Sequence, residues 1–174
     1  MTLNSRLFPG SLPALAFILA TSAAAGTVLA DDDGQQLMNI AHPAYRSECG
    51  SCHIAFPPSL LTANSWRAVM TGLDKHFGSD ASLDADTARD ITNFLVANAG
   101  RRDTSSADGK PLLRITETRW FRKEHRDGHD GITPGVFRSA AVKSAANCSA
   151  CHRDAEQGDY SEDRIRIPAN GARS

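Results

Sequence analysis

The sequence lacks a strong charge of either sign. After residue 30 it also lacks an apolar segment long enough to span a membrane, which takes about 20 residues. Its 174 residues carry 19 Lys and Arg against 20 Asp and Glu, for a formal net charge of −1. Without a basic excess, a nucleic-acid-binding protein is not expected. A chain of this length has room for one or two small domains.

Cysteine is scarce, and none is left over from one repeated motif. The four cysteines all lie in two copies of Cys-x-x-Cys-His, at residues 49–53 and 148–152. This motif is the attachment signature of c-type haem, because two thiols add to the two vinyl groups of one porphyrin and the following histidine binds the iron. The motifs therefore predict two covalently bound haems c, held by Cys49, Cys52, His53, Cys148, Cys151 and His152.

Two other uses of paired cysteines explain these motifs less well. A disulfide within Cys-x-x-Cys closes too short a loop to stabilise a fold, and neither motif lies in the βαβ pattern of a thioredoxin-like protein. A zinc site could use cysteines and histidines, but it does not explain why each motif ends in histidine.

Residues 1–30 have the organisation of a secretory signal peptide. One charge precedes an apolar stretch at 12–19, small residues follow, and residues 28–30 resemble a cleavage site. An uncleaved membrane anchor is the alternative, but Pro9 and Pro13 interrupt a stretch that is already short. We expect cleavage and export to the bacterial periplasm, the side of the membrane on which haem c is attached.

The remaining chain divides into two halves with one motif each. We predict an N-terminal haem domain over residues 31–100, a polar linker over 101–109 and a C-terminal haem domain over 110–174. Each half is close to the size at which a protein core alone is marginal. We therefore expect each haem to form the centre of its own core and the haem-free protein to be poorly folded.

Helical spacing of apolar residues dominates, and alternating strand patterns are few. The pattern predicts helices over residues 66–77, 84–99 and 116–126. Asn64 or Ser65 caps the first of these, Gly78 ends it, and Gly100 ends the second. The tail from Tyr160 onward is expected to be irregular. The predicted fold class is mostly α, in two small haem-centred domains.

The group that binds the opposite face of each iron decides what each haem does. In the first half, His76 lies near the end of a predicted helix and 23 residues past His53, which is enough chain to reach the other haem face. Met70 on the same helix, His42 and Met38 are the other candidates. We predict His76 as the distal ligand.

The second half contains no methionine, so its distal ligand must come from His125 or His129. His125 follows two aromatic residues in a predicted helix, whereas His129 lies in a turn-like stretch. We predict His125, which makes both irons bis-histidine. Without a thioether ligand, we expect lower potentials than in a His/Met cytochrome.

Longer strings around these residues strengthen the prediction by resemblance. They are ECGSCHIAFPPSLL (48–61), SW (65–66), HFGSDASL (76–83), RITETRWF (114–121) and ANCSACHR (146–153). They resemble the dihaem cytochrome c family, whose best-known members are soluble partners of the sphaeroides haem protein in purple bacteria. The resemblance implies a class-I-cytochrome-c-like N-terminal haem domain and a less regular C-terminal one with short helices. It also implies bis-histidine irons, with His53 paired with His76 and His152 paired with His125.

The resemblance implies an electron carrier rather than an enzyme. Electrons would come from a membrane quinol-oxidising cytochrome b and leave to a soluble haem-protein acceptor, with no nucleic acid involved and no membrane embedding after cleavage. The alternatives are a small dihaem subunit of a periplasmic terminal reductase, a peroxidase, and a small-ligand sensor with one open iron. An open iron would bind carbon monoxide when reduced.

One predicted helix face is basic. Its members fall at helical spacing and are Arg119, Arg122, Lys123 and Arg126. The face is a solvated surface, a face that pairs with haem propionates, or a docking patch beside the second haem. Complementary charge on a docking patch would raise the encounter rate with a redox partner.

Overall fold

The computed structural model describes residues 40–169, so the predicted signal peptide and the candidate Met38 lie outside the described residues. The described residues belong to one compact unit. Their regular structure is helical, and within residues 40–169 only isolated β-bridges occur. None of the helices in this range is long and apolar enough to cross a membrane. The fold is mostly α, as predicted.

Helix α1 (Pro43–Gly50) leads directly into the first motif and is absent from the sequence-based prediction. Its cap is the reason, because His42 stands where Ser, Thr, Asp or Asn is usual. The Nδ1 atom of His42 accepts a hydrogen bond from the Tyr45 N–H at 3.2 Å. Its Nε2 atom lies 3.2 Å from a carboxylate oxygen of Asp90. His42 thus fastens α1 to the helix that carries Asp90.

Helix α2 (Ala63–Thr71) is shorter than the predicted helix and begins earlier. Thr62, not Asn64 or Ser65, is its N-cap, and its hydroxyl accepts the N–H of Ser65. The helix ends at Gly72, so the predicted end at Gly78 was wrong. A single 3₁₀ turn (Leu73–Lys75) follows, and Gly78 adopts a φ of 103° in the next turn.

Helix α3 (Ala85–Ala97) confirms the predicted second helix. The Asp84 carboxylate caps it by accepting the N–H groups of Asp86 and Thr87. A hydrogen bond from the Thr87 side chain is the main reason why the pKa of Asp84 is lowered, and the bond from the Thr87 N–H acts in the same direction. After the helix, Gly100 packs so closely on the Ser59 backbone that no Cβ would fit there.

Helix α4 (Arg119–Glu124) is the core of the predicted third helix, which is broken in two. A 3₁₀ turn (Ile115–Glu117) precedes it, and Thr118 caps it by accepting the N–H of Phe121 at 3.1 Å. His125 is the C-cap residue. Further 3₁₀ turns are Pro58–Leu60, Val136–Arg138, Cys148–Ala150, Ala155–Gln157 and Glu162–Arg164.

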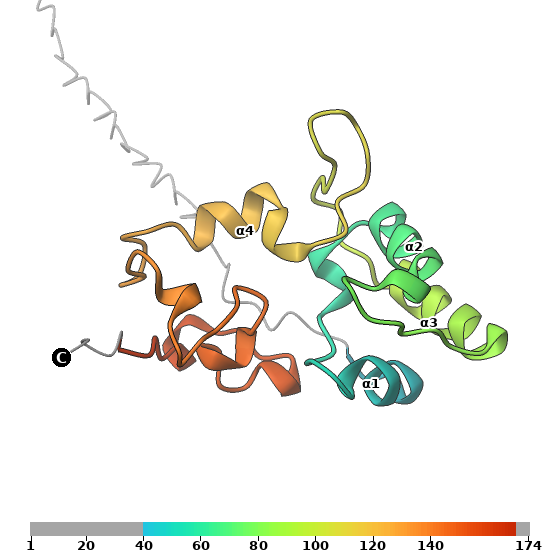
Figure 1. Ribbon diagram of the computed structural model, residues 1–174, viewed down its shortest axis with the longest axis horizontal. Coiled ribbons are helices and arrows are strands. Elements are labelled where there is room, and N and C mark those ends of the chain that lie inside the picture. Colours follow the sequence, from blue (N-terminus) through green and yellow to red (C-terminus); the bar gives the residue numbers. More distant parts are fainter. Residues whose placement is uncertain (1–39, 170–174) are drawn as a thin grey trace, which may run out of the picture. The chain divides into compact units, whose positions relative to one another are not determined.

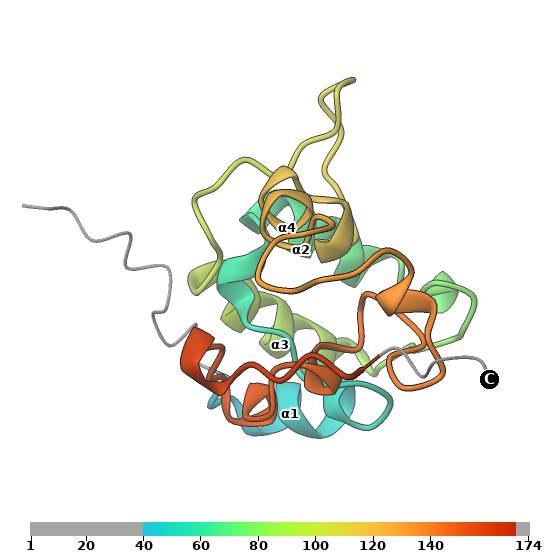
Figure 2. The same ribbon diagram turned by 90° about the vertical axis from the view of Figure 1, so that its left-hand side faces the viewer.

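The N-terminal half has a substantial protein core, and the C-terminal half has a small one. In the first half, α2 packs on α3 and α1 packs on α3 (Figure 1). The buried residues there are Tyr45, Ala55, Leu61, Trp66, Ile91 and Leu95. In the second half a separate cluster contains Ile132, Val136 and Val142. Figure 2 shows how few helical turns the C-terminal residues form.

Two buried aromatic side chains fix the segment that follows the first motif. The Tyr45 hydroxyl donates to the carbonyl of Phe56 at 2.6 Å. The Trp66 indole N–H donates to the carbonyl of Pro58 at 2.6 Å. Residues 54–61 are therefore held from both α1 and α2, which gives the first motif a rigid setting.

Most of residues 101–109 form an exposed loop that projects from the helices in Figures 1 and 2. Thr104 is the exception, since it is 3 % exposed. Its hydroxyl lies 2.8 Å from the hydroxyl of Thr62 and 2.9 Å from that of Ser65. The segment is thereby tied to the start of α2, and the division into two haem domains around it stays a prediction.

Candidate haem-binding sites

The two Cys-x-x-Cys-His motifs lie in different local structures. Cys49 is in the last turn of α1, and Cys148 begins a 3₁₀ turn. None of the four cysteines forms a disulfide. Burial raises the pKa of Cys49 and that of Cys148 to about 11, so neither of these two thiols is the low-pKa thiolate of a thioredoxin-type site. Within residues 40–169 no group of three or more Cys, His, Asp or Glu side chains could hold a metal ion, which leaves the zinc alternative without a donor set.

Each motif histidine faces a second histidine from a distant part of the chain. The ring centroids of His53 and His76 are 6.2 Å apart, with 23° between the ring planes. The centroids of His125 and His152 are also 6.2 Å apart, with 58° between the planes. These are the two pairs that the sequence predicts.

The separation fits one metal ion between the rings of each pair. A metal–imidazole bond of about 2 Å on either side, added to the half-widths of the two rings, places the centroids about 6 Å apart. Rings in direct contact would be closer than this. The residues therefore fit a haem iron with two axial imidazoles.

The N-terminal pair is anchored on its proximal side. The Nδ1 atom of His53 lies 2.7 Å from the carbonyl oxygen of Ile54, and its ring stacks on Phe56 at 4.8 Å. His76 follows the 3₁₀ turn after α2. Burial is the main reason why the pKa of His76 is lowered, and the charges of His53 and Arg114 act in the same direction.

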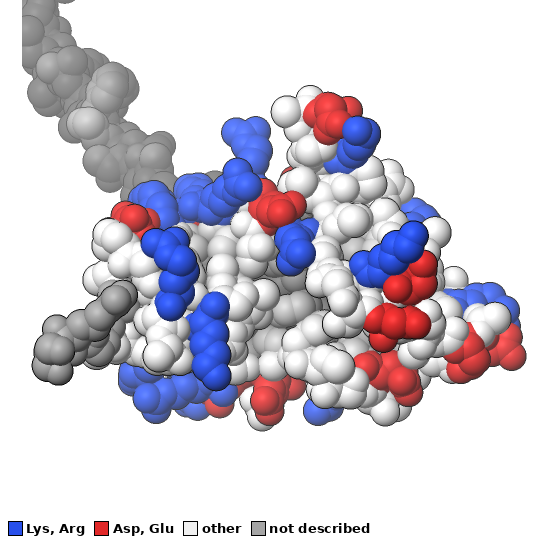
Figure 3. Space-filling view, viewed as in Figure 1, with Lys and Arg blue, Asp and Glu red and all other residues white. Residues whose placement is uncertain are grey.

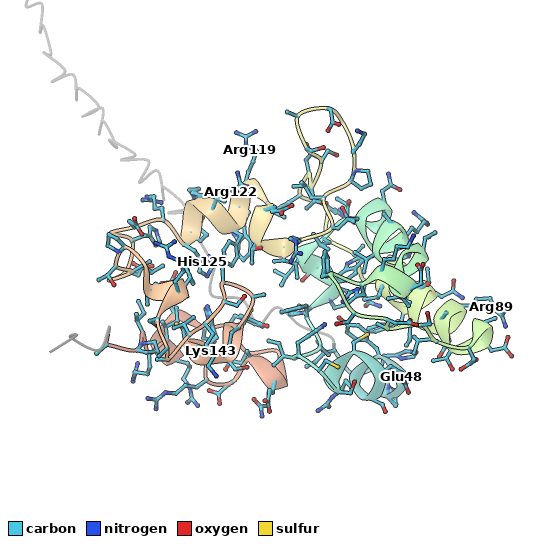
Figure 4. All side chains as sticks on the ribbon, in the orientation of Figure 1. Glu48, Arg89, Arg119, Arg122, His125 and Lys143 are labelled. Atoms are coloured by element: carbon cyan, nitrogen blue, oxygen red, sulfur yellow. The ribbon has the colours of Figure 1, made fainter. Side chains whose placement is uncertain are left out.

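The C-terminal pair is anchored on its distal side instead. The Nδ1 atom of His125 lies 3.0 Å from the carbonyl oxygen of Phe121. The two rings stack at 4.0 Å, with 8° between their planes. Figure 4 shows His125 at the end of α4, on the side away from Arg119 and Arg122.

A cavity that opens to solvent surrounds the C-terminal pair. Its walls are largely apolar, with Leu60 from the N-terminal half and Ile115, Trp120, Phe121, Ile132 and Phe137 from the C-terminal half. Cys148, Cys151 and His152 line the same cavity. A mostly apolar cavity with a few convergent polar groups is typical of a cofactor site.

Two buried polar atoms in this cavity have no partner within the described chain. They are the Nδ1 atom of His152 and the hydroxyl oxygen of Tyr160, whose rings are 5.1 Å apart. Burial, followed by the charge of His125, lowers the pKa of His152 to about 4. The imidazole is therefore neutral near pH 7, the form that binds a metal.

The other candidate ligands among the described residues have different partners. Met70 packs against the N-terminal core. His42 caps α1 and pairs with Asp90. His129 also lines the cavity, but its Nδ1 atom lies 2.9 Å from a carboxylate oxygen of Asp130.

Sequence reasoning did not find three parts of the sites. These are Tyr160 beside His152, the contact of Leu60 with the C-terminal cavity, and the stacking of Arg114 on Phe77. Tyr160 belongs to a tail without periodicity, and the other two depend on contacts between the halves.

Comparison with known proteins agrees with this geometry. The family model described as Dihaem cytochrome c matches residues 45–160. The crystal structure of DHC purified from Rhodobacter sphaeroides is 41% identical, with a TM-score of 0.60, over 71% of this chain and 100% of that chain. A second structure, diheme cytochrome c from the same organism, is 40% identical with a TM-score of 0.61, over 70% and 98%.

A structure from a different organism has a similar TM-score at a lower identity. The diheme cytochrome c from Shewanella baltica OS155 is 37% identical, with a TM-score of 0.60, over 73% of this chain and 93% of that chain. No curated protein sequence matches the chain.

Proposed function

Because the chain belongs to the dihaem cytochrome c family, we propose that it is a periplasmic electron carrier between a membrane quinol-oxidising cytochrome b and a soluble haem-protein acceptor. As a dihaem cytochrome c it carries two covalently bound haems c and takes part in electron transfer. The compartment, the partners and the direction of transfer are our proposal. The single observation that carries it is the pair of histidine couples, each with a centroid separation of 6.2 Å.

The residues divide into attachment and axial positions. Cys49 and Cys52 hold the N-terminal haem, and Cys148 and Cys151 hold the C-terminal one. His53 with His76, and His125 with His152, are the axial ligands. Bound haem supplies the one-electron Fe(III)/Fe(II) couple.

The protein keeps both irons closed. Two imidazoles leave no coordination site for oxygen or peroxide, which suits electron transfer better than catalysis or ligand sensing. Hydrogen bonds from Nδ1 to the carbonyls of Ile54 and Phe121 fix the orientation of His53 and His125. Such bonds also make the imidazole a stronger donor and favour the ferric state.

Charge supports a route to the C-terminal haem through α4. Residues 101–169 contain 13 Lys and Arg against 11 Asp and Glu, whereas residues 40–100 contain four against six. Figure 3 shows Lys and Arg gathered over α4, and Figure 4 shows Arg119 and Arg122 projecting from it. We propose this face as the approach side of a partner with an acidic surface, because electrostatic steering accelerates such encounters.

A reductase subunit is the second candidate within electron transfer. It would share both sites, and co-purification with a larger enzyme would identify it. A peroxidase or a ligand sensor needs one five-coordinate iron, and the arrangement of both histidine pairs argues against that.

The test uses the full chain expressed in a host that attaches haem c. Membranes that contain a quinol-oxidising cytochrome b should reduce the purified protein, and heat-inactivated membranes should not. The reduced protein should bind no carbon monoxide. Failure of the membranes to reduce it would overturn the proposed donor, and stoichiometric carbon monoxide binding would overturn the electron-carrier assignment.

A further inference from the structure

Phe77, the residue directly after His76, is held in an unfavourable backbone conformation. Its φ is 50°, which is rare for a bulky residue and persists only where the surroundings enforce it. Its ring is 46 % exposed, so burial in the core does not enforce it. The tight turn closed by the Ser79 N–H and the His76 carbonyl holds the backbone of Phe77, and a contact from outside the turn holds its ring.

That contact comes from the C-terminal half of the chain. The Cζ atom of Arg114 lies 3.9 Å from the centroid of the Phe77 ring, within the range of a cation–π interaction. The Phe77 ring in turn contacts the His76 ring, with centroids 4.8 Å apart. Guanidinium, phenyl and imidazole thus form a continuous chain of contacts that ends at the N-terminal histidine pair.

Few other interactions hold the turn around His76. Backbone hydrogen bonds close it from Ser79 N–H to the His76 carbonyl at 3.0 Å and from Ala81 N–H to the Leu73 carbonyl at 2.8 Å. Among the hydrogen bonds of residues 40–169 that the structure defines, none reaches the His76 ring. The equivalent ring of His125 has both a hydrogen bond and a stacked phenyl ring. His76 therefore depends more on the contact with Phe77.

We propose that Arg114 is a positioning residue for the N-terminal haem: it clamps Phe77 and so holds His76 opposite His53. The proposal rests on the proposed function, because it takes His76 to be the distal ligand. The same guanidinium places a fixed positive charge on the distal side of this haem. Reduction adds one electron to the haem, so the charge favours the reduced state and raises its potential.

A neighbouring carboxylate partly offsets this charge. The Nε atom of Arg114 lies 3.8 Å from a carboxylate oxygen of Glu117. Both side chains are about half exposed, at 48 % and 45 %. Neutralising each in turn must therefore shift the potential in opposite directions, which a purely structural role does not produce.

The first measurement is an EPR-monitored redox titration of the holoprotein, in which His76→Gly identifies the N-terminal signal. Arg114→Gln should lower the equilibrium constant for reduction of the N-terminal haem about threefold to tenfold, where tenfold corresponds to 59 mV. Glu117→Gln should raise it by a smaller factor. Arg119→Gln is the charge-matched control on α4 and should change it less than twofold.

The second measurement is the rate at which excess cyanide replaces His76 on the oxidised N-terminal haem, which is limited by dissociation of His76. Phe77→Gly removes the ring and also relieves the unfavourable φ, so this variant should fold. We expect a rate about threefold to tenfold above that of the native chain, as the loss of a cation–π contact predicts. Arg114→Lys keeps the charge but not the planar stacking, and should give an intermediate rate without lowering the potential.

Two results would overturn the inference. One is an unchanged potential in both Arg114→Gln and Glu117→Gln, and the other is an unchanged rate of cyanide binding in Phe77→Gly. Failure of the proposed function looks different, because the native ferric protein would then already contain high-spin iron before any substitution.

Discussion

The two candidate haem sites share one distance and differ in almost everything around it. Both histidine pairs have ring centroids 6.2 Å apart, but the ring planes make angles of 23° in the N-terminal pair and 58° in the C-terminal pair. The N-terminal pair is anchored through His53 and the C-terminal pair through His125. A separation of about 6 Å is what two imidazoles on one iron require. Iron does not require a particular angle between the ring planes or a particular anchoring contact.

The surroundings differ as strongly as the rings do. Six residues of the N-terminal half form a buried cluster, and the helices α1, α2 and α3 pack around it. The C-terminal half has three buried residues in its cluster and mostly 3₁₀ turns. A haem placed in the C-terminal cavity would therefore contribute a larger share of the core than its N-terminal counterpart. Four experiments test this comparison, in order of decreasing expected effect.

Loss of the C-terminal haem should unfold its half of the chain. In Cys148→Ala/Cys151→Ala we expect residues 128–169 to lose amide protection, because so little apolar surface remains buried without haem. The matched variant Cys49→Ala/Cys52→Ala should keep protection in α2 and α3. Hydrogen exchange with mass spectrometry measures both. If the C-terminal amides of Cys148→Ala/Cys151→Ala stay protected, the C-terminal half does not depend on its haem more than the N-terminal half does.

Removal of one distal histidine should open one iron. His76→Gly and His125→Gly should each bind one carbon monoxide per chain when reduced, whereas the native chain binds none. Optical titration gives the stoichiometry. Met70→Leu is the control and should stay closed. A native level of ligand resistance in His125→Gly would assign the distal position to another residue, with His129 the first to examine.

The buried hydroxyl contacts between Thr104 and α2 should stabilise the N-terminal half. Thr104→Val keeps the shape but leaves the hydroxyl groups of Thr62 and Ser65 with fewer partners. We expect a loss of about 1–3 kcal/mol in the free energy of unfolding, measured by denaturant titration. The exposed neighbour Ser105→Ala should change it by less than about 0.5 kcal/mol. Equal effects of the two substitutions would mean that the hydroxyl contacts of Thr104 do not stabilise the N-terminal half.

Neutralising the α4 face should slow electron exchange with anionic reagents. For Arg119→Gln/Arg122→Gln we expect oxidation of the C-terminal haem by ferricyanide to slow about tenfold at 0.01 M ionic strength, and much less at high salt. Arg67→Gln/Arg89→Gln is charge-matched and lies in the N-terminal half. Stopped-flow spectroscopy follows the reaction. Identical rates for both double variants would show that α4 is not the approach side.

The sequence predicted the parts of the fold that local signals specify. Asp84, the apolar spacing behind it and the absence of breakers until Asn98 were enough for α3. Helix α1 escaped prediction because histidine caps it, through a partner on α3 that sequence neighbours do not reveal. The first predicted helix was too long because the apolar pattern continues past Gly72, where the backbone turns away from helical geometry.

In the candidate sites, too, local signals could be predicted from the sequence and contacts between distant segments could not. The attachment residues follow from spacing alone, and His76 and His125 from the short supply of other ligands. Tyr160 and the stacking of Arg114 on Phe77 could not be predicted, because they depend on packing between segments far apart in the chain. The angle between ring planes has no sequence signal either, since it is set by how each turn holds its histidine.

Low-temperature EPR of the ferric holoprotein tests the central claim most directly. The angle between axial imidazole planes controls how far the iron d orbitals split, so two bis-histidine haems with 23° and 58° should give two distinct low-spin signals. The N-terminal signal should be the more rhombic and the C-terminal signal the more anisotropic, with no high-spin iron. A substantial high-spin signal would mean an open iron and would contradict the account of two closed haems.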